Sequence, residues 1–177
     1  MDVITAIHTR RSVRAYTDAP VDDEAVRTML AAAMTAPSAG NEQPWEFVIV
    51  NDAAILAEIP TVHPYAGMAP KAPLGILVCG NTAKEKYRGF WVQDCSAATE
   101  NLLLAAVGCG LGAVWLGVYP VEERVKAFAA LFGLPEEVIP MAFVVIGHPK
   151  KEQQPQNRFD ASKTHLNGWQ PGKLPQF

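Results

Sequence analysis

The chain has 177 residues and a formal net charge of −3, with 49% hydrophobic and 19% charged residues. Such a composition is typical of a globular protein with a sizeable core and excludes an intrinsically disordered chain. The acidic balance provides no general attraction for nucleic acid, and no apolar run approaches the ~20 residues of a membrane-spanning helix. Because the N-terminus carries no basic stretch followed by an apolar one, we expect a soluble, cytoplasmic protein without a signal peptide.

The first half of the chain alternates between helical and extended patterns. Asp2 and Asp52 are suitable N-caps, and an acidic first turn at residues 22–24 suits the positive end of a helix dipole. The predicted elements in order are a helix over 2–8, an extended segment over 10–14, a helix over 23–35, a loop over 37–44, a strand over 45–50, a helix over 53–59 and an irregular loop over 60–73.

The second half contains the longest helical pattern, which is apolar on more than one side. Such a helix is either central in the fold or part of a subunit interface, because each apolar side must be covered. The predicted elements are a buried strand over 74–79, this helix over 87–107, a strand over 111–118, a helix over 120–133, a strand over 141–147 and a polar tail over 148–177.

Helices separate the four predicted strands along the chain. Each connection is long enough for parallel pairing of the strands that it joins. We therefore expect an α+β protein, with a sheet covered by helices on both faces. No internal boundary is visible, so residues 1–177 are predicted to form one domain with residues 148–177 as an extended tail. The tail has no core of its own and can be ordered only by lying on another surface.

Three arginines and a serine stand close together near the N-terminus. In an extended segment, Arg10, Ser12 and Arg14 point one way, while Arg11 and Val13 point the other. Arginine binds phosphate oxygens through paired hydrogen bonds, and a serine hydroxyl adds a neutral donor. This row suits an elongated ligand with an anionic head and a polar ring, and flavin mononucleotide (FMN) fits that description. The alternative is a solvated basic patch on a connecting segment.

Other chemistries find little support in the sequence. The glycine run over 108–112 follows a helix and precedes a strand, which is the reverse of a dinucleotide-binding fingerprint. No GxSxG motif is present, the four histidines lack metal-ligand spacing, and the three cysteines form no CxxC pair, so we expect no metal site. The remaining possibility is a protein whose bound cofactor carries the chemistry, which needs many binding residues and few catalytic ones.

The chain resembles the FMN-dependent nitroreductase family in its small, minimal form. The resemblance rests on residues 10–14, on 36–45 (Ala-Pro-Ser-Ala-Gly-Asn-Glu-Gln-Pro-Trp), on the block over 91–115 and on Arg158-Phe159. It covers nearly the whole chain in order and spacing. It implies a sandwich with a central mixed sheet of four to five strands, assembled as an intertwined homodimer with two FMN molecules at the interface.

The resemblance also assigns roles to individual residues. Arg10 and Ser12 would hold the phosphate with Arg158, and Arg14 would stabilise the reduced flavin as the one catalytic side chain, without a dedicated acid or base. Pro37, Ser38, Ala39 and Asn41 would come from the partner subunit, and the backbone of β-strand residues would face the ring at N5 and O4. The complete set of cofactor-binding candidates is Arg10, Arg11, Ser12, Arg14, Pro37, Ser38, Ala39, Asn41, Trp115, Leu116, Gly117 and Arg158.

The function implied is transfer of hydride from NADH or NADPH through flavin N5 to a small electron-poor acceptor, such as a nitroaromatic or a quinone. Flavin reduction and reductive dehalogenation are alternatives on the same fold. A non-catalytic alternative is a flavin-storing protein or a nucleic-acid-binding module that uses the arginine row. No sequence motif distinguishes NADH from NADPH.

Overall fold

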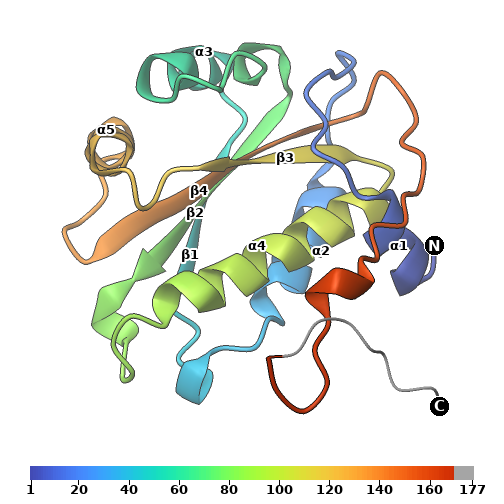
Figure 1. The fold of residues 1–177 in the computed structure, drawn as a ribbon. Coiled ribbons are helices and arrows are strands. Elements are labelled where there is room, and N and C mark those ends of the chain that lie inside the picture. Colours follow the sequence, from blue (N-terminus) through green and yellow to red (C-terminus); the bar gives the residue numbers. More distant parts are fainter. Residues whose placement is uncertain (170–177) are drawn as a thin grey trace.

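A single antiparallel sheet forms the centre of the computed structural model, which describes residues 1–169 (Figure 1). Its order is β1-β2-β4-β3, and every neighbouring pair runs antiparallel. The strands are β1 (Trp45–Val50), β2 (Leu74–Asn81), β3 (Gly112–Gly117) and β4 (Val138–Gly147). The expectation of a mixed sheet with parallel neighbours is therefore wrong, because a long connection permits parallel pairing but also allows the chain to return antiparallel.

Within residues 1–169, five α-helices surround the sheet, and most of their ends follow the predicted caps closely, although the longest helix begins four residues after its predicted start at 87. They are α1 (Val3–Thr9), α2 (Asp23–Met34), α3 (Ala53–Val62), α4 (Trp91–Gly108) and α5 (Glu122–Phe132). Asp2, Asp22 and Asp52 each accept a hydrogen bond from a backbone N–H of the first turn, and α5 ends at Gly133 in the left-handed conformation. Helix α3 continues past the predicted end at Ile59 and contains Pro60 in its last turn.

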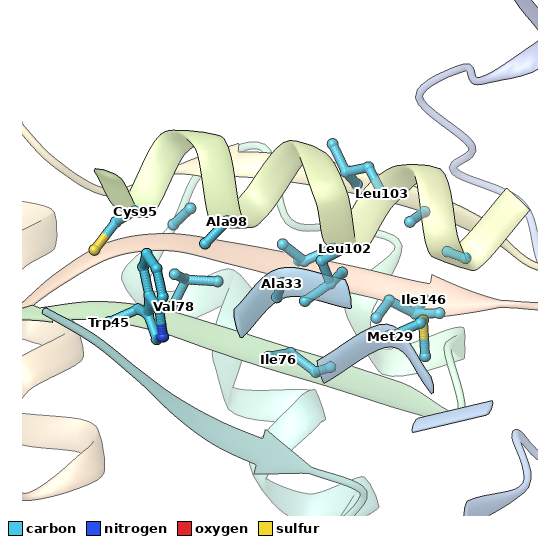
Figure 2. Packing of buried hydrophobic residues seen from close by; sticks show 14 of the residues in the cluster. Met29, Ala33, Trp45, Ile76, Val78, Cys95, Ala98, Leu102, Leu103 and Ile146 are labelled. Carbon is cyan, nitrogen blue, oxygen red and sulfur yellow. The ribbon is translucent and has the colours of Figure 1, made fainter. Parts of the chain in front are cut away.

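The helices cover both faces of the sheet, as the sequence predicted. Helices α2 and α4 lie on one face, and α3 and α5 lie on the other (Figure 1). Figure 2 shows Ala98 and Leu102 of α4 above Ile76 and Val78 of the sheet, with Met29 of α2 beside them. Strand β2 is buried from Leu74 to Gly80 because both of its faces are covered, which explains its nearly continuous apolar sequence.

The segment after α1 lies along the free edge of β3. Ser12 and Ala113 form an isolated parallel bridge, and the Val13 N–H donates to the Ala113 carbonyl oxygen at 2.9 Å. Gly112 permits this close approach, because a Cβ atom at Gly112 would lie 2.7 Å from Val13 Cγ2. Val13 is buried in the core beneath α3 and α5, so it anchors the arginine row to the sheet.

The C-terminal tail lies against the N-terminal segment of the same chain. Lys150 N–H donates to the Ala15 carbonyl oxygen at 3.0 Å, and Gln156 N–H donates to the His8 carbonyl oxygen at 3.0 Å. The predicted tail extends over 148–177, and its residues 170–177 lie outside the described part. Within residues 1–169, no helix is both long and apolar enough to cross a lipid bilayer.

Candidate functional site

Three guanidinium groups surround one surface hollow of about 290 Å³. Arg10 follows the last turn of α1 as its C-cap, and Arg11 is the next residue along the extended segment. Arg158 comes from the tail, whose pairing with His8 brings it to the same place. The structure thus brings together predicted site residues that are about 150 positions apart in the sequence.

The guanidinium groups of this arginine hollow (Arg10, Arg11 and Arg158) carry excess positive charge. Arg10 Nε forms an ion pair with Glu100 Oε1 of α4 at 3.2 Å. Arg158 donates from Nε and Nη2 to Oε1 of the neutral Gln156 side chain. Partial burial, together with the charges of Arg158 and Arg10, lowers the pKa of the Arg11 guanidinium. One carboxylate faces three cations here, so the hollow suits a second anion, and the fork-shaped donors match phosphate oxygens.

The remaining residues of the row alternate in burial as an extended segment requires. Ser12 and Arg14 are exposed, while Val13 between them is buried. Arg14 Nη1 donates to the Ser12 carbonyl oxygen at 3.4 Å, so its side chain folds back along the segment. Arg11 departs from the predicted alternation, because its guanidinium returns to the Arg10 carbonyl oxygen and lines the same hollow as Arg10.

The loop over 37–44 is held by two buried carboxylates. Asp94 Oδ1 of α4 accepts from the Ala39 N–H at 3.1 Å, and Glu42 Oε1 accepts from two backbone N–H groups at residues 86 and 87. Ser38 Oγ accepts from the Gln43 N–H at 3.0 Å. Burial raises the pKa of Asp94, and the nearby Glu42 and Glu85 charges add to this effect. The loop backbone is therefore fixed before any ligand binds.

Pro37, Ser38, Ala39 and Asn41 lie on another side of α4 from the arginine hollow. The loop bonds to α4 at Asp94, whereas the hollow bonds to it at Glu100. The two positions are six residues apart on the helix, which separates them by ~9 Å along the axis and by roughly 120° around it. One chain therefore does not bring the two groups of predicted residues to a single site.

The backbone of Trp115 and Gly117 points toward the free edge of the sheet. Residues of an edge strand alternate between bonding their neighbour and facing outward. The outward Ala113 carbonyl accepts from Val13, so residues 115 and 117 share its direction, whereas Leu116 faces β4. A Cβ atom built at Gly117 meets nothing within 4 Å, so there is open space beside this peptide. A flat ligand with acceptor atoms can approach the edge here.

Sequence reasoning missed the residues that support the candidate site. Glu100 and Asp94 are acidic residues on a mostly apolar helix, which is the signal that could have singled them out. His63 and Arg124 both reach the Gly117 carbonyl oxygen, at 3.0 and 2.9 Å, from distant parts of the chain. No local pattern connects these two residues with β3.

Comparisons with known proteins agree with this architecture. The sequence model of the Nitroreductase family matches residues 7–62 and 60–148. A Methanothermobacter thermautotrophicus protein, provisionally named NADH dehydrogenase/NAD(P)H nitroreductase, is 48% identical over 169 residues, which cover 96% of this chain and 88% of that protein. A crystal structure of a Parabacteroides distasonis protein with the same provisional name has a TM-score of 0.90 and 39% identity, covering 94% of this chain and 98% of that one.

A third similar protein was solved with a flavin. It is a provisionally named nitroreductase from Desulfovibrio desulfuricans in complex with FMN, with a TM-score of 0.79 and 33% identity, covering 96% of this chain and 99% of that one. The family match extends over most of the sequence, and the fold agrees over almost all of it. This chain therefore belongs to the Nitroreductase family.

Proposed function

We propose that this protein is an FMN-dependent oxidoreductase that takes electrons from NADH or NADPH and passes them to a small electron-poor acceptor such as a nitroaromatic or a quinone. The single observation that carries the proposal is the arginine hollow beside an open sheet edge. In this proposal, the hollow binds the phosphate and the edge near Gly117 faces the ring, and the segment over 10–14, which pairs with β3 at Ala113, connects the two. The FMN complex of the Desulfovibrio desulfuricans relative supports the choice of cofactor, and the name of the Methanothermobacter relative supports the choice of electron donor.

In this proposal, Arg10, Arg11 and Arg158 bind the phosphate of FMN with the help of Ser12. The charge of the hollow supports this assignment, because binding an anion relieves repulsion between neighbouring guanidinium groups. On FMN binding, the Arg14 guanidinium would leave the Ser12 carbonyl oxygen, to which it donates in this structure, and turn toward the ring. There it stabilises the negative charge that the ring gains on reduction. The backbone of Trp115, Leu116 and Gly117 lines the ring edge.

We further propose that two chains form an intertwined homodimer, with residues 1–177 as one domain of each. Pro37, Ser38, Ala39 and Asn41 then complete the site of the partner subunit. Their position on another side of α4 from the arginine hollow supports this assignment, because they cannot reach the hollow of their own chain without leaving Asp94. Exposed apolar side chains on α1, among them Val3 and Ile4, offer surface for such an interface.

When bound, FMN supplies the redox chemistry by accepting hydride at N5 and returning it to a second substrate. The protein contributes binding, orientation and charge, and no side chain of the described residues needs to act as an acid or base in the first half-reaction. The three cysteines are free thiols, which suits the reducing environment of the cytoplasm as the proposed location.

The test is an anaerobic titration of the purified protein. A yellow protein with absorption near 450 nm, bleached by NADH or NADPH and recoloured by a nitroaromatic or a quinone, would support the proposal. Bleaching followed by release of reduced FMN would favour a flavin reductase, and recolouring only by halogenated substrates would favour a dehalogenase. A yellow protein that neither nucleotide bleaches would favour flavin storage. A colourless monomer that does not take up added FMN would contradict the proposal.

A further inference from the structure

Gly117, the last residue of β3, is held by two side chains from α3 and α5, the helices on the sheet face opposite to α2 and α4. The Gly117 carbonyl oxygen accepts from His63 Nε2 at 3.0 Å and from Arg124 Nη1 at 2.9 Å. His63 is the C-cap of α3, and Arg124 lies in the first turn of α5. Two helices on one face of the sheet thus meet at a single carbonyl group. The Gly117 N–H belongs to the preceding peptide and faces the same open sheet edge, because both backbone groups of a strand residue point to one side.

The hydrogen-bond partners of His63 determine its protonation. A carbonyl oxygen only accepts, so Nε2 carries the hydrogen that bonds Gly117. The Tyr65 backbone N–H only donates, and it lies 3.2 Å from Nδ1, so Nδ1 is bare. The imidazole is therefore neutral. Burial lowers its pKa, and the positive charge of Arg124 lowers it further, which agrees with this assignment. The ionisable side chains beside His63 are Tyr65, whose ring meets the imidazole edge-on, and Arg124.

Arg124 adds a permanent positive charge to the same carbonyl group. Its guanidinium carbon also lies 5.7 Å from the centroid of the Tyr65 ring, in a cation–π contact that restrains the side chain. A carbonyl that accepts from a cation becomes more polarised, and hydrogen bonds to charged groups are about twice as strong as neutral ones. The pair therefore holds the Gly117 peptide more firmly than the end of an edge strand normally is.

We propose that His63 and Arg124 are positioning residues. By holding the Gly117 carbonyl group, they fix the end of β3 whose Gly117 N–H faces the flavin ring, and they place the positive charge of Arg124 near that ring. The inference rests on the proposed function, because it requires FMN at the edge of β3. Its consequence is a cofactor that is easier to reduce, since the charge of Arg124 favours the electron-rich form of the ring. Neither residue touches a substrate in this account.

The experiment compares paired substitutions that separate charge, donor and volume. Arg124→Met keeps a similar aliphatic side chain and removes the charge, whereas Arg124→Lys keeps the charge but lacks the planar guanidinium with its several N–H donors. His63→Leu removes the donor, whereas His63→Gln retains an N–H that can reach Gly117. Lys126→Met is the matched control, because Lys126 is an exposed cation on the same helix whose recorded partner is Glu122.

The readouts are the midpoint potential of bound FMN and ¹⁵N NMR of the His63 ring in the cofactor-free protein. For Arg124→Met, we expect the preference for reduced over oxidised FMN to fall about tenfold, which is ~30 mV for a two-electron couple. Arg124→Lys and His63→Gln are expected to restore part of the loss, and Lys126→Met to cause none. In the wild type, the NMR spectrum at pH 7 is expected to show hydrogen on Nε2 alone.

The outcomes separate this inference from the function on which it rests. Colourless wild-type protein that binds no FMN overturns both. Yellow, reducible wild-type protein with an unchanged potential in Arg124→Met overturns the positioning role and leaves the proposed function in place. A His63 ring that is protonated on Nδ1 at pH 7 also overturns it, without any need for bound flavin. If His63→Leu does not fold, the comparison of Arg124→Met with Arg124→Lys decides whether the positioning role holds.

Discussion

Replacing Gly112 by alanine is expected to disturb the arginine row from beneath. The added Cβ atom would lie 2.7–2.9 Å from three atoms of the Val13 side chain, where van der Waals contact requires more than 3.4 Å. Val13 is β-branched and buried, so it cannot rotate out of the way without leaving its core contacts. The substitution therefore pushes the segment that carries Ser12 and Arg14 away from β3.

The expected size of the effect follows from two opposing contributions. Overpacking of this kind costs about 1–3 kcal/mol. Gly112 lies outside the left-handed backbone region, so the alanine also restricts the unfolded chain and recovers ~0.4–1 kcal/mol. The net loss is on the order of 1–2 kcal/mol, which lowers Tm by about 2–8 °C for a chain of this size. Displacement of Ser12, the neutral phosphate donor in the proposed function, removes a hydrogen bond of ~0.5–1.5 kcal/mol and is expected to raise the Kd for FMN about 2–10-fold.

Thermal unfolding followed by circular dichroism, at one fixed protein concentration, measures the first effect, and FMN fluorescence quenching measures the second. Gly108→Ala is the matched control, because Gly108 lies in the last turn of α4 and a Cβ atom there meets nothing within 4 Å. We expect its Tm to be unchanged or raised by roughly 1–3 °C, given the helix preference of alanine. A Gly112→Ala protein with wild-type Tm and wild-type FMN affinity would refute the reasoning.

Three further predictions concern charge. Arg14→Ala is expected to lower the midpoint potential of bound FMN, because it removes a cation next to the ring; an unchanged potential in spectroelectrochemical titration would count against this role. Glu100→Gln frees Arg10 from its half-exposed ion pair, and equilibrium titration should show FMN affinity rising about 1.5–5-fold at low salt, with a smaller gain at high salt. Burial raises the pKa of Asp94 in the folded state above its value of ~3.8 in the unfolded chain, so ionisation of Asp94 opposes folding. The free energy of unfolding of the wild type therefore falls as the pH rises from ~3.8 through the higher folded-state pKa. Asp94→Asn keeps the acceptor for Ala39 and should be at least as stable as wild type in urea unfolding at pH 7, with its relative advantage declining toward pH 4; a constant difference across this range would exclude the titration of Asp94 as the cause.

Local patterns predicted the elements well because their causes are local. Strand β1 agrees with its predicted range of residues 45–50, since the aromatic and β-branched residues there are bounded by Pro44 on one side and by Asn51 on the other. Asp2 and Asp52 cap helices as predicted, because capping requires only a side chain and the next two or three N–H groups. The alternation of Ser12, Val13 and Arg14 also depends on extended backbone alone.

The errors arise where distant parts of the chain decide the structure. Strand direction depends on how α3 returns over the sheet, which the length of its connection does not specify. Pro60 was expected to end α3, but a proline in the last turn sacrifices a single hydrogen bond, and the His63 N–H still reaches the Ile59 carbonyl oxygen. Likewise, the contact of His63 with Gly117 joins residues 54 positions apart.

The unfinished border of the sheet gives the proposed ligand a second purpose. Within residues 1–169, strand β3 is an outer strand that pairs on its outer side only through the isolated bridge between Ser12 and Ala113. The unpaired N–H and C=O groups of such an edge strand can pair with a strand of another molecule. A planar ring seated beside Trp115 and Gly117 would occupy that border and act as a seal. Loss of the ligand would then expose the protein to association as well as depriving it of its chemistry.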